Sequence, residues 1–349
     1  MNKEMIFADN LKKAIENAGI NMTVLANETG ITYNMIKKYC HAQAEPTVSY
    51  ALRMAKVLNV SLDELMGYEV PEAKDMFREV FEEDFTYITG FMRVVRKYGH
   101  KEAMVDPVDE TTWTYDELNA DVNMFSNALL AGGVDKGDVV LFQLPNCREF
   151  VFSYLAPQKI GAITSPANPN FSPGESSVCM DTSKPKVYIY DAELKDNAVK
   201  ALEISSHKPE VIIMAGEGEL PQGHIRYEDY VAGHSVAEPE TDFKPYIYDE
   251  VMRLYTSGTT GKPKGVPINN ANEVLTCHDV MMHFPMNTTD TTMNMTPWFH
   301  RGGIHSGGPS PTFYAGGRVV ILRNFQPQLS LKYAEKYGIT FLIGVPSVM

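Results

Sequence analysis

Positive charge, cysteine and long apolar runs are all scarce in this sequence of 349 residues. Lysine and arginine together number 31 against 44 aspartates and glutamates, which gives a formal net charge of −13. This balance argues against a protein whose whole surface binds nucleic acid, although it is compatible with a local DNA-reading helix. No run of about 18 or more apolar residues occurs, so we expect no membrane span.

The four cysteines, Cys40, Cys147, Cys179 and Cys277, are widely spaced and form no CxxC pair. Zinc sites and thiol–disulfide motifs need such pairs, so the sequence predicts no metal site, and it favours reduced thiols in a cytoplasm. The first 19 residues are charged and amphipathic and lack the apolar segment of a signal peptide. We therefore expect a cytoplasmic protein.

The length indicates more than one domain, because a single core rarely grows past about 250–300 residues. Residues 1–67 carry short helical patterns, residues 68–84 form a linker rich in acidic side chains, and residues 85–349 alternate between strand and helix patterns. The composition, 44% hydrophobic and 21% charged, is that of a soluble globular protein.

Residues 1–67 predict five short helices, and the second and third have the features of a helix-turn-helix. Ala26 is small enough for two helices to cross closely, Gly30 permits a left-handed turn, and Ile36 can pin the third helix. The segment LANETGITYNMIKKY, with PTVSYALRMAKVLNVSLDELMG after it, resembles the Cro/repressor-type helix-turn-helix family.

That resemblance implies that the exposed face of the third helix, residues 33–40, enters the major groove of DNA, with two heads pairing as a homodimer on a symmetric site. An asparagine can read adenine and lysines suit phosphates. A solvated face used for protein contact is the alternative. The implied DNA contacts are Thr32, Tyr33, Asn34, Lys37 and Lys38.

From residue 85 onward the pattern predicts an α/β domain in which helices cover a largely parallel sheet. The strands are expected at 138–144, 162–165, 186–190, 211–214, 252–255, 318–322 and 340–343. The helices are expected at 115–130, 147–160, 175–182, 194–203, 272–282 and 329–337.

The richest motif is LYTSGTTGKPKGV at residues 254–266, whose glycines, hydroxyls and lysines suit a polyphosphate. It lacks the spacing of the mononucleotide P-loop, and Pro263 does not fit a helix that begins at the phosphate. We expect a mobile loop between strands at 251–256 and 264–268. An ordinary hairpin turn is the alternative, but a turn needs neither a second lysine nor so many hydroxyls.

This motif resembles the phosphate loop of the AMP-forming adenylate enzymes, which include the acyl-CoA synthetases. Other segments resemble that family in the same order, including WTYDELNADVNMFSNALLAGGVDKGD, MTPWFHRGG and ITFLIGVPSVM. The resemblance implies a ligase that joins a carboxylic acid to ATP with Mg²⁺ and then to coenzyme A, as in fatty acid metabolism. The residues it places on the ATP phosphates are Thr256, Ser257, Gly258, Thr259, Thr260, Gly261, Lys262 and Lys264.

The implied catalytic residues are Lys262, on the phosphates, and His300, near the substrate carboxylate or the acyl tunnel. A packed histidine at a strand end is the alternative for His300, and His305 is expected to be an ordinary packed histidine. The family's Tyr-Gly-x-Thr-Glu segment, ribose aspartate and adenylation lysine do not occur in these 349 residues. We therefore expect a truncated large domain with little or no ligase activity alone.

Two further functions stay open. In one, the chain is a transcriptional regulator whose adenylate-enzyme part senses ATP or an acyl ligand without catalysis. In the other, it is a fragment with no independent role. The acid substrate and the DNA sequence cannot be read from these residues.

Overall fold

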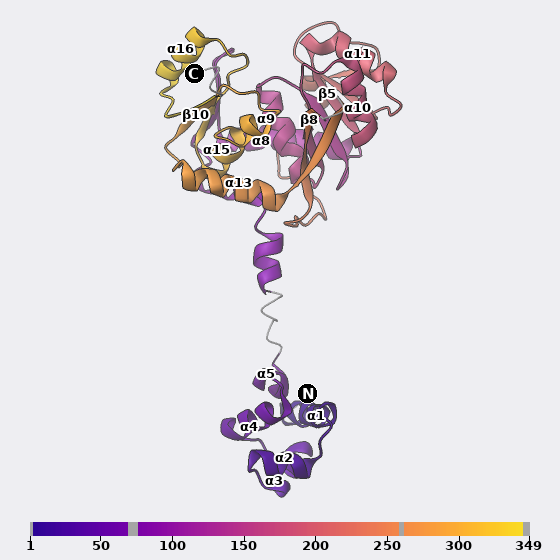
Figure 1. Cartoon of the computed structure of the whole chain (residues 1–349), viewed down its shortest axis with the longest axis vertical. Helices are drawn as coiled ribbons and strands as arrows, with labels where there is room; N and C mark the ends of the chain where they lie inside the picture. The colour runs from indigo at the N-terminus through magenta and orange to yellow at the C-terminus, as the bar shows by residue number, and fades with distance from the viewer. Residues whose placement is uncertain (1–2, 69–75, 258–261, 345–349) are drawn as a thin grey trace. The chain divides into compact units, whose positions relative to one another are not determined.

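The computed structural model describes residues 3–68, 76–257 and 262–344 (Figure 1). The chain divides into two compact units, Met1–Phe77 and Arg78–Met349. None of the described helices combines the length and the apolar composition needed to cross a membrane.

The first unit is a small helical bundle with the helices that the sequence predicts. Leu11, Leu25, Ile36 and Met54 are fully buried at its centre. The turn between the second and third helices is at Gly30, which has the left-handed φ of 67°. The helices are α1 (Lys3–Asn17), α2 (Met22–Thr29), α3 (Tyr33–Cys40), α4 (Val48–Leu58) and α5 (Leu62–Met66).

The second unit contains two sheets, where the sequence indicated one largely parallel sheet. The larger has the order β7-β6-β5-β3-β4-β8-β9, and the smaller has the order β12-β10-β11-β1-β2. The larger sheet comprises β3 (Val139–Gln143), β4 (Ile163–Pro166), β5 (Val187–Asp191), β6 (Val211–Ala215), β7 (Ile225–Arg226), β8 (Glu250–Ser257) and β9 (Pro263–Asn269). The smaller comprises β1 (Glu102–Asp106), β2 (Thr111–Thr114), β10 (Thr291–Asn294), β11 (Arg318–Val320) and β12 (Phe341–Ile343).

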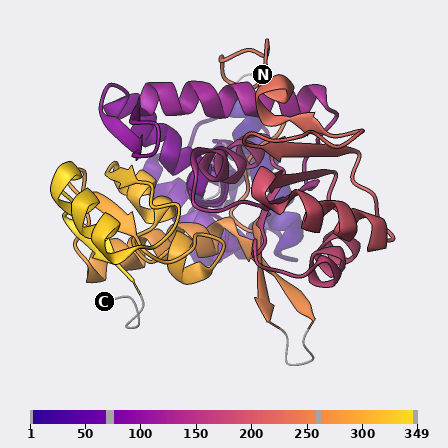
Figure 2. The ribbon, with the colours of Figure 1, turned by 90° about the horizontal axis from the view of Figure 1, so that it is seen from above.

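Helices lie between the two sheets and on their outer faces. Figure 1 shows α8 and α9 between the part that contains β10 and the part that contains β5 and β8, and Figure 2 shows the same unit from above. The predicted helices are α8 (Tyr115–Ala131), α9 (Arg148–Lys159), α10 (Pro173–Ser183), α11 (Lys195–Ile204), α13 (Asn270–His283) and α16 (Pro327–Tyr337). The others are η1 (Arg78–Glu83), α7 (Tyr87–Tyr98), η2 (Ala192–Leu194), α12 (Tyr227–Val231), α14 (Arg301–Ile304) and α15 (Pro309–Ala315).

The main core lies between the sheets and joins side chains of α7, α8 and α9 to both of them. A second cluster packs α10 and α11 on the outer face of the larger sheet, and a third packs α16 on the smaller. Strands β3 and β5 are buried along their whole length, which explains their continuous apolar sequences.

The segment 78–83, which the sequence places in an acidic linker, is helical and belongs to the second unit. The carbonyl of Glu82 accepts a hydrogen bond from the backbone N–H of Ile247 at 2.6 Å. This contact attaches the helix to the segment that leads into β8.

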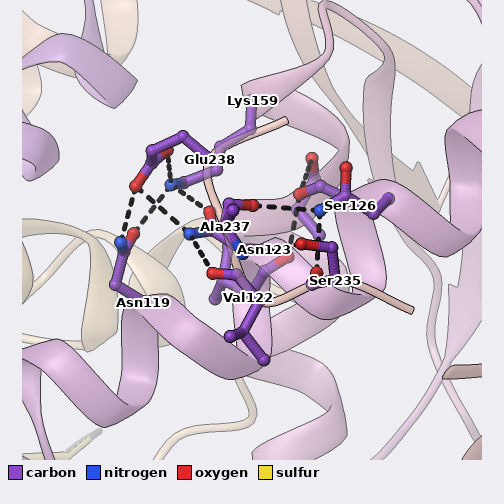
Figure 3. Close-up of polar contacts among 11 residues, drawn as sticks. Asn119, Val122, Asn123, Ser126, Lys159, Ser235, Ala237 and Glu238 are labelled. Carbon is purple, nitrogen blue, oxygen red and sulfur yellow. Dashed lines mark hydrogen bonds and ion pairs between the residues drawn. The ribbon is translucent and has the colours of Figure 1, made fainter. Parts of the chain in front are cut away.

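The buried side chain of Lys159, in α9, forms hydrogen bonds to α8 and to the segment between α12 and β8 (Figure 3). Nζ of Lys159 donates to Oδ1 of Asn119 at 2.7 Å, to Oδ1 of Asn123 at 2.6 Å and to Oε2 of Glu238 at 2.6 Å. Both asparagines in turn donate to Oε1 of Glu238. The buried lysine therefore has three hydrogen-bond acceptors, one of them the carboxylate of Glu238, which is itself exposed.

Candidate functional site

The phosphate-loop motif forms the end of an antiparallel hairpin. Strands β8 and β9 pair up to the motif itself, with Thr256 opposite Lys264 and Ser257 opposite Pro263. The predicted loop residues Gly258, Thr259, Thr260 and Gly261 lie outside the described residues. The two flanking strands are as predicted, each extended by one residue at both ends.

The described members of the motif are open to solvent. Thr256, Lys262 and Lys264 are all exposed. Within the described parts of the chain, no hydrogen bond or ion pair is formed by either lysine side chain. These ammonium groups are therefore available to an external anion.

The last glycine of the motif has a packing role. A Cβ at Gly265 would lie 2.9 Å from Cδ and 3.2 Å from Cγ of Arg253, which crosses it from β8. Arg253 is itself held by a paired contact with Glu250, at 2.7 and 2.8 Å. Gly265 thus keeps the hairpin flat beneath the arginine, a role distinct from phosphate contact.

His300 lies at the start of a tight turn that follows β10. It occupies the position before α14, and its ring centroid is 4.1 Å from that of Phe299. His300 is an exposed residue, but the surrounding protein partly desolvates its imidazole and lowers the pKa of that ring. The side chain is therefore neutral near pH 7.

A cleft of about 380 Å³ lies beside this turn, at the carboxyl ends of strands from both sheets. Met295, Pro297 and Phe299 come from the segment that carries His300. Thr296 lines the cleft from the same segment. The other walls lie at the ends of β3, β4, β5 and β11, and they consist of Pro145, Asn146, Pro169, Asn170, Asp191, Glu193, Leu194, Leu322, Arg323, Asn324 and Phe325. Ligands of open α/β sheets bind at such an edge.

Asn146 lines this cleft and joins the two sheets, a role that the sequence did not predict. Its Nδ2 donates to the carbonyl of Leu322 at 3.1 Å, and its Oδ1 accepts from the backbone N–H of Trp298 at 2.8 Å. A polar residue just after a buried strand was the only available signal. The described residues of the β8–β9 hairpin do not line this cleft, so the two predicted parts of the site are separate surfaces here.

Charged groups in the cleft wall are paired with one another. Arg323 contacts Asp191 at 2.9 Å and Glu193 at 3.2 Å. No group of three or more histidine, cysteine or acidic side chains in the described residues is placed to hold a metal ion.

In the first unit, the five predicted DNA-contact residues share one exposed surface at α3. Thr32, Tyr33, Asn34, Lys37 and Lys38 are all exposed, whereas Ile36 and Tyr39 of the same helix are buried. Thr32 occupies the position before the helix, but its side chain forms no capping hydrogen bond. Its hydroxyl is therefore available for an external contact.

Comparisons with known proteins match both units. A family model described as AMP-binding enzyme matches residues 91–349, and one described as helix-turn-helix matches residues 11–65. The chain is 25% identical over 262 residues to 4-coumarate–CoA ligase 1 of Solanum tuberosum, which covers 72% of this chain and 46% of that protein. It is 27% identical over 241 residues to the crotonobetaine/carnitine–CoA ligase of Proteus sp., which covers 68% and 46%.

Among solved structures, the anthranilate CoA ligase AuaEII in complex with anthranoyl-AMP matches with a TM-score of 0.70 and 21% identity. The match covers 75% of this chain and 50% of that one, and at this identity it concerns the fold. The chain spans about half the length of the curated relatives that it matches.

Proposed function

The chain belongs to the family of AMP-binding enzymes through residues 91–349, and we propose that this part activates a carboxylic acid with ATP for transfer to coenzyme A. The observation that carries the proposal is the β8–β9 hairpin, which presents an exposed hydroxyl and two exposed lysines that pair with no other described residue. The relatives it matches are named as CoA ligases, which supports an acid–thiol ligase.

In the proposed reaction, a carboxylate oxygen of the acid attacks the α-phosphorus of ATP. The bond from that phosphorus to the bridging oxygen breaks, and pyrophosphate leaves. An acyl-adenylate remains, and the thiol of coenzyme A then displaces AMP from it. Both first reactants are anions, so the protein mainly positions them and neutralises their charge. Mg²⁺ bound with the nucleotide would neutralise part of the negative charge of its phosphates.

The residue roles follow from charge. Lys262 meets the β- and γ-phosphates together with the backbone and hydroxyl groups of residues 256–261, and Lys264 supports the loop. His300, neutral because partial desolvation lowers its pKa, can donate a hydrogen bond to the acid's carboxylate. The cleft beside Phe299 is lined by both apolar and polar residues, and it is the proposed place for the acid's remaining atoms.

A polypeptide of residues 1–349 is expected to release pyrophosphate slowly or not at all. The resemblance assigns the adenylation lysine and the ribose aspartate to motifs that these residues do not include. The measurement is pyrophosphate release from Mg-ATP with a panel of aryl and fatty acids, with the Lys262→Ala variant as the background. Robust acid-dependent turnover would contradict this expectation and would leave ATP binding untouched.

We also propose that residues 1–67 form a DNA-binding head, followed by a linker at 68–84 and the adenylate-forming part from 85. The helix-turn-helix match and the five exposed side chains at α3 support it. Paired heads would meet two half-sites, which makes a homodimer the proposed form on DNA. The four cysteines are free and buried, which fits the cytoplasmic location we propose.

This head favours a second candidate function, a transcriptional regulator whose adenylate-enzyme part senses ATP or an acyl ligand. A gel shift with and without Mg-ATP and a fatty acid separates the two functions. A change in DNA affinity on adding either ligand supports the regulator, and an unchanged affinity contradicts it.

Replacing both Lys37 and Lys38 with alanine is expected to weaken DNA binding on all sequences. Each phosphate contact adds about one unit to the slope of log affinity against log salt, so the slope should fall by about two. Fluorescence anisotropy with a labelled random duplex at several salt concentrations measures it. Lys56→Ala, which removes one exposed lysine from α4, should leave the slope unchanged. An equal fall in Lys56→Ala would show that α3 is not the contact surface.

A further inference from the structure

A buried acidic–basic pair lies directly behind the turn that carries His300. Nε2 of His305 is 2.9 Å from Oε2 of Glu273, and the hydroxyl of Ser310 is 3.3 Å from the same oxygen. Glu273 is 0% exposed and His305 is 2% exposed. Because a carboxylate only accepts, the imidazole donates through Nε2. The sequence had indicated only an ordinary packed histidine at 305.

The two partners belong to the two segments that the proposed function uses. Glu273 is in the first turn of α13, which begins at Asn270 directly after β9, the strand that carries Lys264. His305 directly follows α14, which His300 precedes. The contact therefore joins the helix that follows the phosphate hairpin to the turn that holds the histidine.

The turn itself has little freedom between its anchors. A Cβ at Gly303 would lie 1.9 Å from the carbonyl oxygen of Pro297, and one at Gly308 would lie 1.8 Å from that of Gly303. On the other side, Nδ2 of Asn294 donates to the carbonyls of Gly302, Gly303 and Ser306 at 3.0–3.2 Å. Because this backbone packing makes the turn rigid, the orientation of the His300 side chain depends on the contacts that hold the two ends of the turn.

The pair also has few other directional contacts. In the described part of the chain, Oε1 of Glu273 and Nδ1 of His305 have no hydrogen-bond partner. The helix α13 is held at its start by Asn270, whose Oδ1 accepts from the backbone of Tyr87 at 3.2 Å. The bond from Glu273 therefore ties the side chain of His305 to α13, whereas Asn294 holds the neighbouring backbone of the turn to β10.

We propose that Glu273 and His305 are positioning residues that hold the His300 turn in place through their mutual contact. The functional value of this role rests on the proposed function, because it is His300 that would face the acid. The position of His300, however, can be measured without any substrate. The proposed positioning role and the proposed ligase function can therefore be tested independently of each other.

The test replaces the pair by leucines, in the double variant Glu273→Leu/His305→Leu. Buried polar pairs can often be exchanged for apolar residues without loss of stability, so this variant is expected to remove the tether and to keep the fold. The matched control is Ser126→Ala, which removes a buried hydroxyl bonded to Val122 and Ala156. Neither Glu273 nor His305 contacts substrate in the proposed reaction.

The first readout is the pKa of His300, followed by NMR of ¹³C-labelled histidine and assigned by the signal lost in His300→Asn. In the unchanged protein it should lie below the ordinary value, because the turn keeps the ring partly desolvated. In the double variant it should rise toward the ordinary value, and in Ser126→Ala it should not move. A merely structural role would lower stability and leave this pKa unchanged.

The second readout is amide hydrogen exchange of Gly303 and Ile304, whose N–H groups bond to the carbonyl of His300. Exchange there should become roughly tenfold faster in the double variant, since local opening becomes easier. If the double variant does not fold, Glu273→Gln decides the question, with the same changes expected at smaller size. An unchanged His300 pKa and unchanged exchange in the folded variant overturn the proposal. Absent Mg-ATP binding by the unchanged protein would instead overturn the proposed function.

Discussion

Replacing Lys262 with alanine is expected to weaken Mg-ATP binding by roughly ten- to a hundredfold. The side chain is exposed at the start of β9, and no carboxylate in the described residues pairs with it. Its contact with a triphosphate is therefore a full charge-assisted interaction, for which about 1.5–3 kcal/mol is usual. Each 1.4 kcal/mol corresponds to about a tenfold change in affinity. Isothermal titration with Mg-ATP measures it directly.

The matched control is Lys200→Ala, which removes an exposed lysine from α11 and leaves the hairpin intact. Both variants should melt close to the unchanged protein, because surface substitutions usually alter stability by less than about 0.5 kcal/mol. A combined Thr259→Ala/Thr260→Ala variant should also lose affinity, since it removes two hydroxyl donors. Unchanged Mg-ATP affinity in both Lys262→Ala and Thr259→Ala/Thr260→Ala would refute the phosphate-binding role of the hairpin.

The sequence was sufficient for the parts of the fold whose pattern is local. The helices of the first unit and the strands on either side of the phosphate motif lie where their spacing predicts them. Strands β3 and β5 were also predictable, because both of their faces are buried and all but the last residue of each is apolar or aromatic. The division into a helical head and an α/β part follows from the same change of pattern.

Strand β10 was missed because most of its buried residues are polar. Strand β10 is buried throughout, yet Thr291, Thr292 and Asn294 are polar. Neighbouring elements satisfy them, as Thr292 and Thr312 do through a buried hydroxyl–hydroxyl contact of 2.9 Å. Without β10, the presence of two sheets could not be inferred, since β10 joins β11 to β12.

The same limit applies to the site. His300 and the hairpin were found because short motifs mark them, whereas Asn146 and Glu273 act through partners far away in sequence. Asn146 reaches Leu322 and Trp298, and Glu273 reaches His305, across separations of 32 to 176 residues. Such contacts depend on how the two sheets pack. The sequence marks Asn146 only as a polar residue just after a buried strand, and it does not identify the partners of Asn146 or Glu273.

Replacing Glu238 with alanine is expected to cost the second unit about 3 kcal/mol of its free energy of unfolding near pH 7. The side chain of Lys159 is 3% exposed, and Glu238 is its charge partner at 2.6 Å. Removing one partner of a buried pair leaves an uncompensated charge, for which about 3–5 kcal/mol is usual. The low end applies because Glu238 is itself 53% exposed. Urea unfolding followed by tryptophan fluorescence measures it, since both tryptophans, Trp113 and Trp298, lie in this unit.

The loss in Glu238→Ala should shrink as the solution becomes alkaline. Burial already lowers the pKa of Lys159 in the unchanged protein, although Glu238 opposes the shift, so removing Glu238 lowers that pKa further. Between this folded pKa and the unfolded value of about 10.5, only the unfolded chain binds the extra proton, so stability rises with pH. The control Lys159→Met/Glu238→Ala has no ammonium group at position 159. It should be more stable than Glu238→Ala near neutral pH, and its stability should not rise with pH in the way that the buried lysine causes. A deficit that stays constant from about pH 7 to about pH 10 would show that the lysine is not held there as a buried charge.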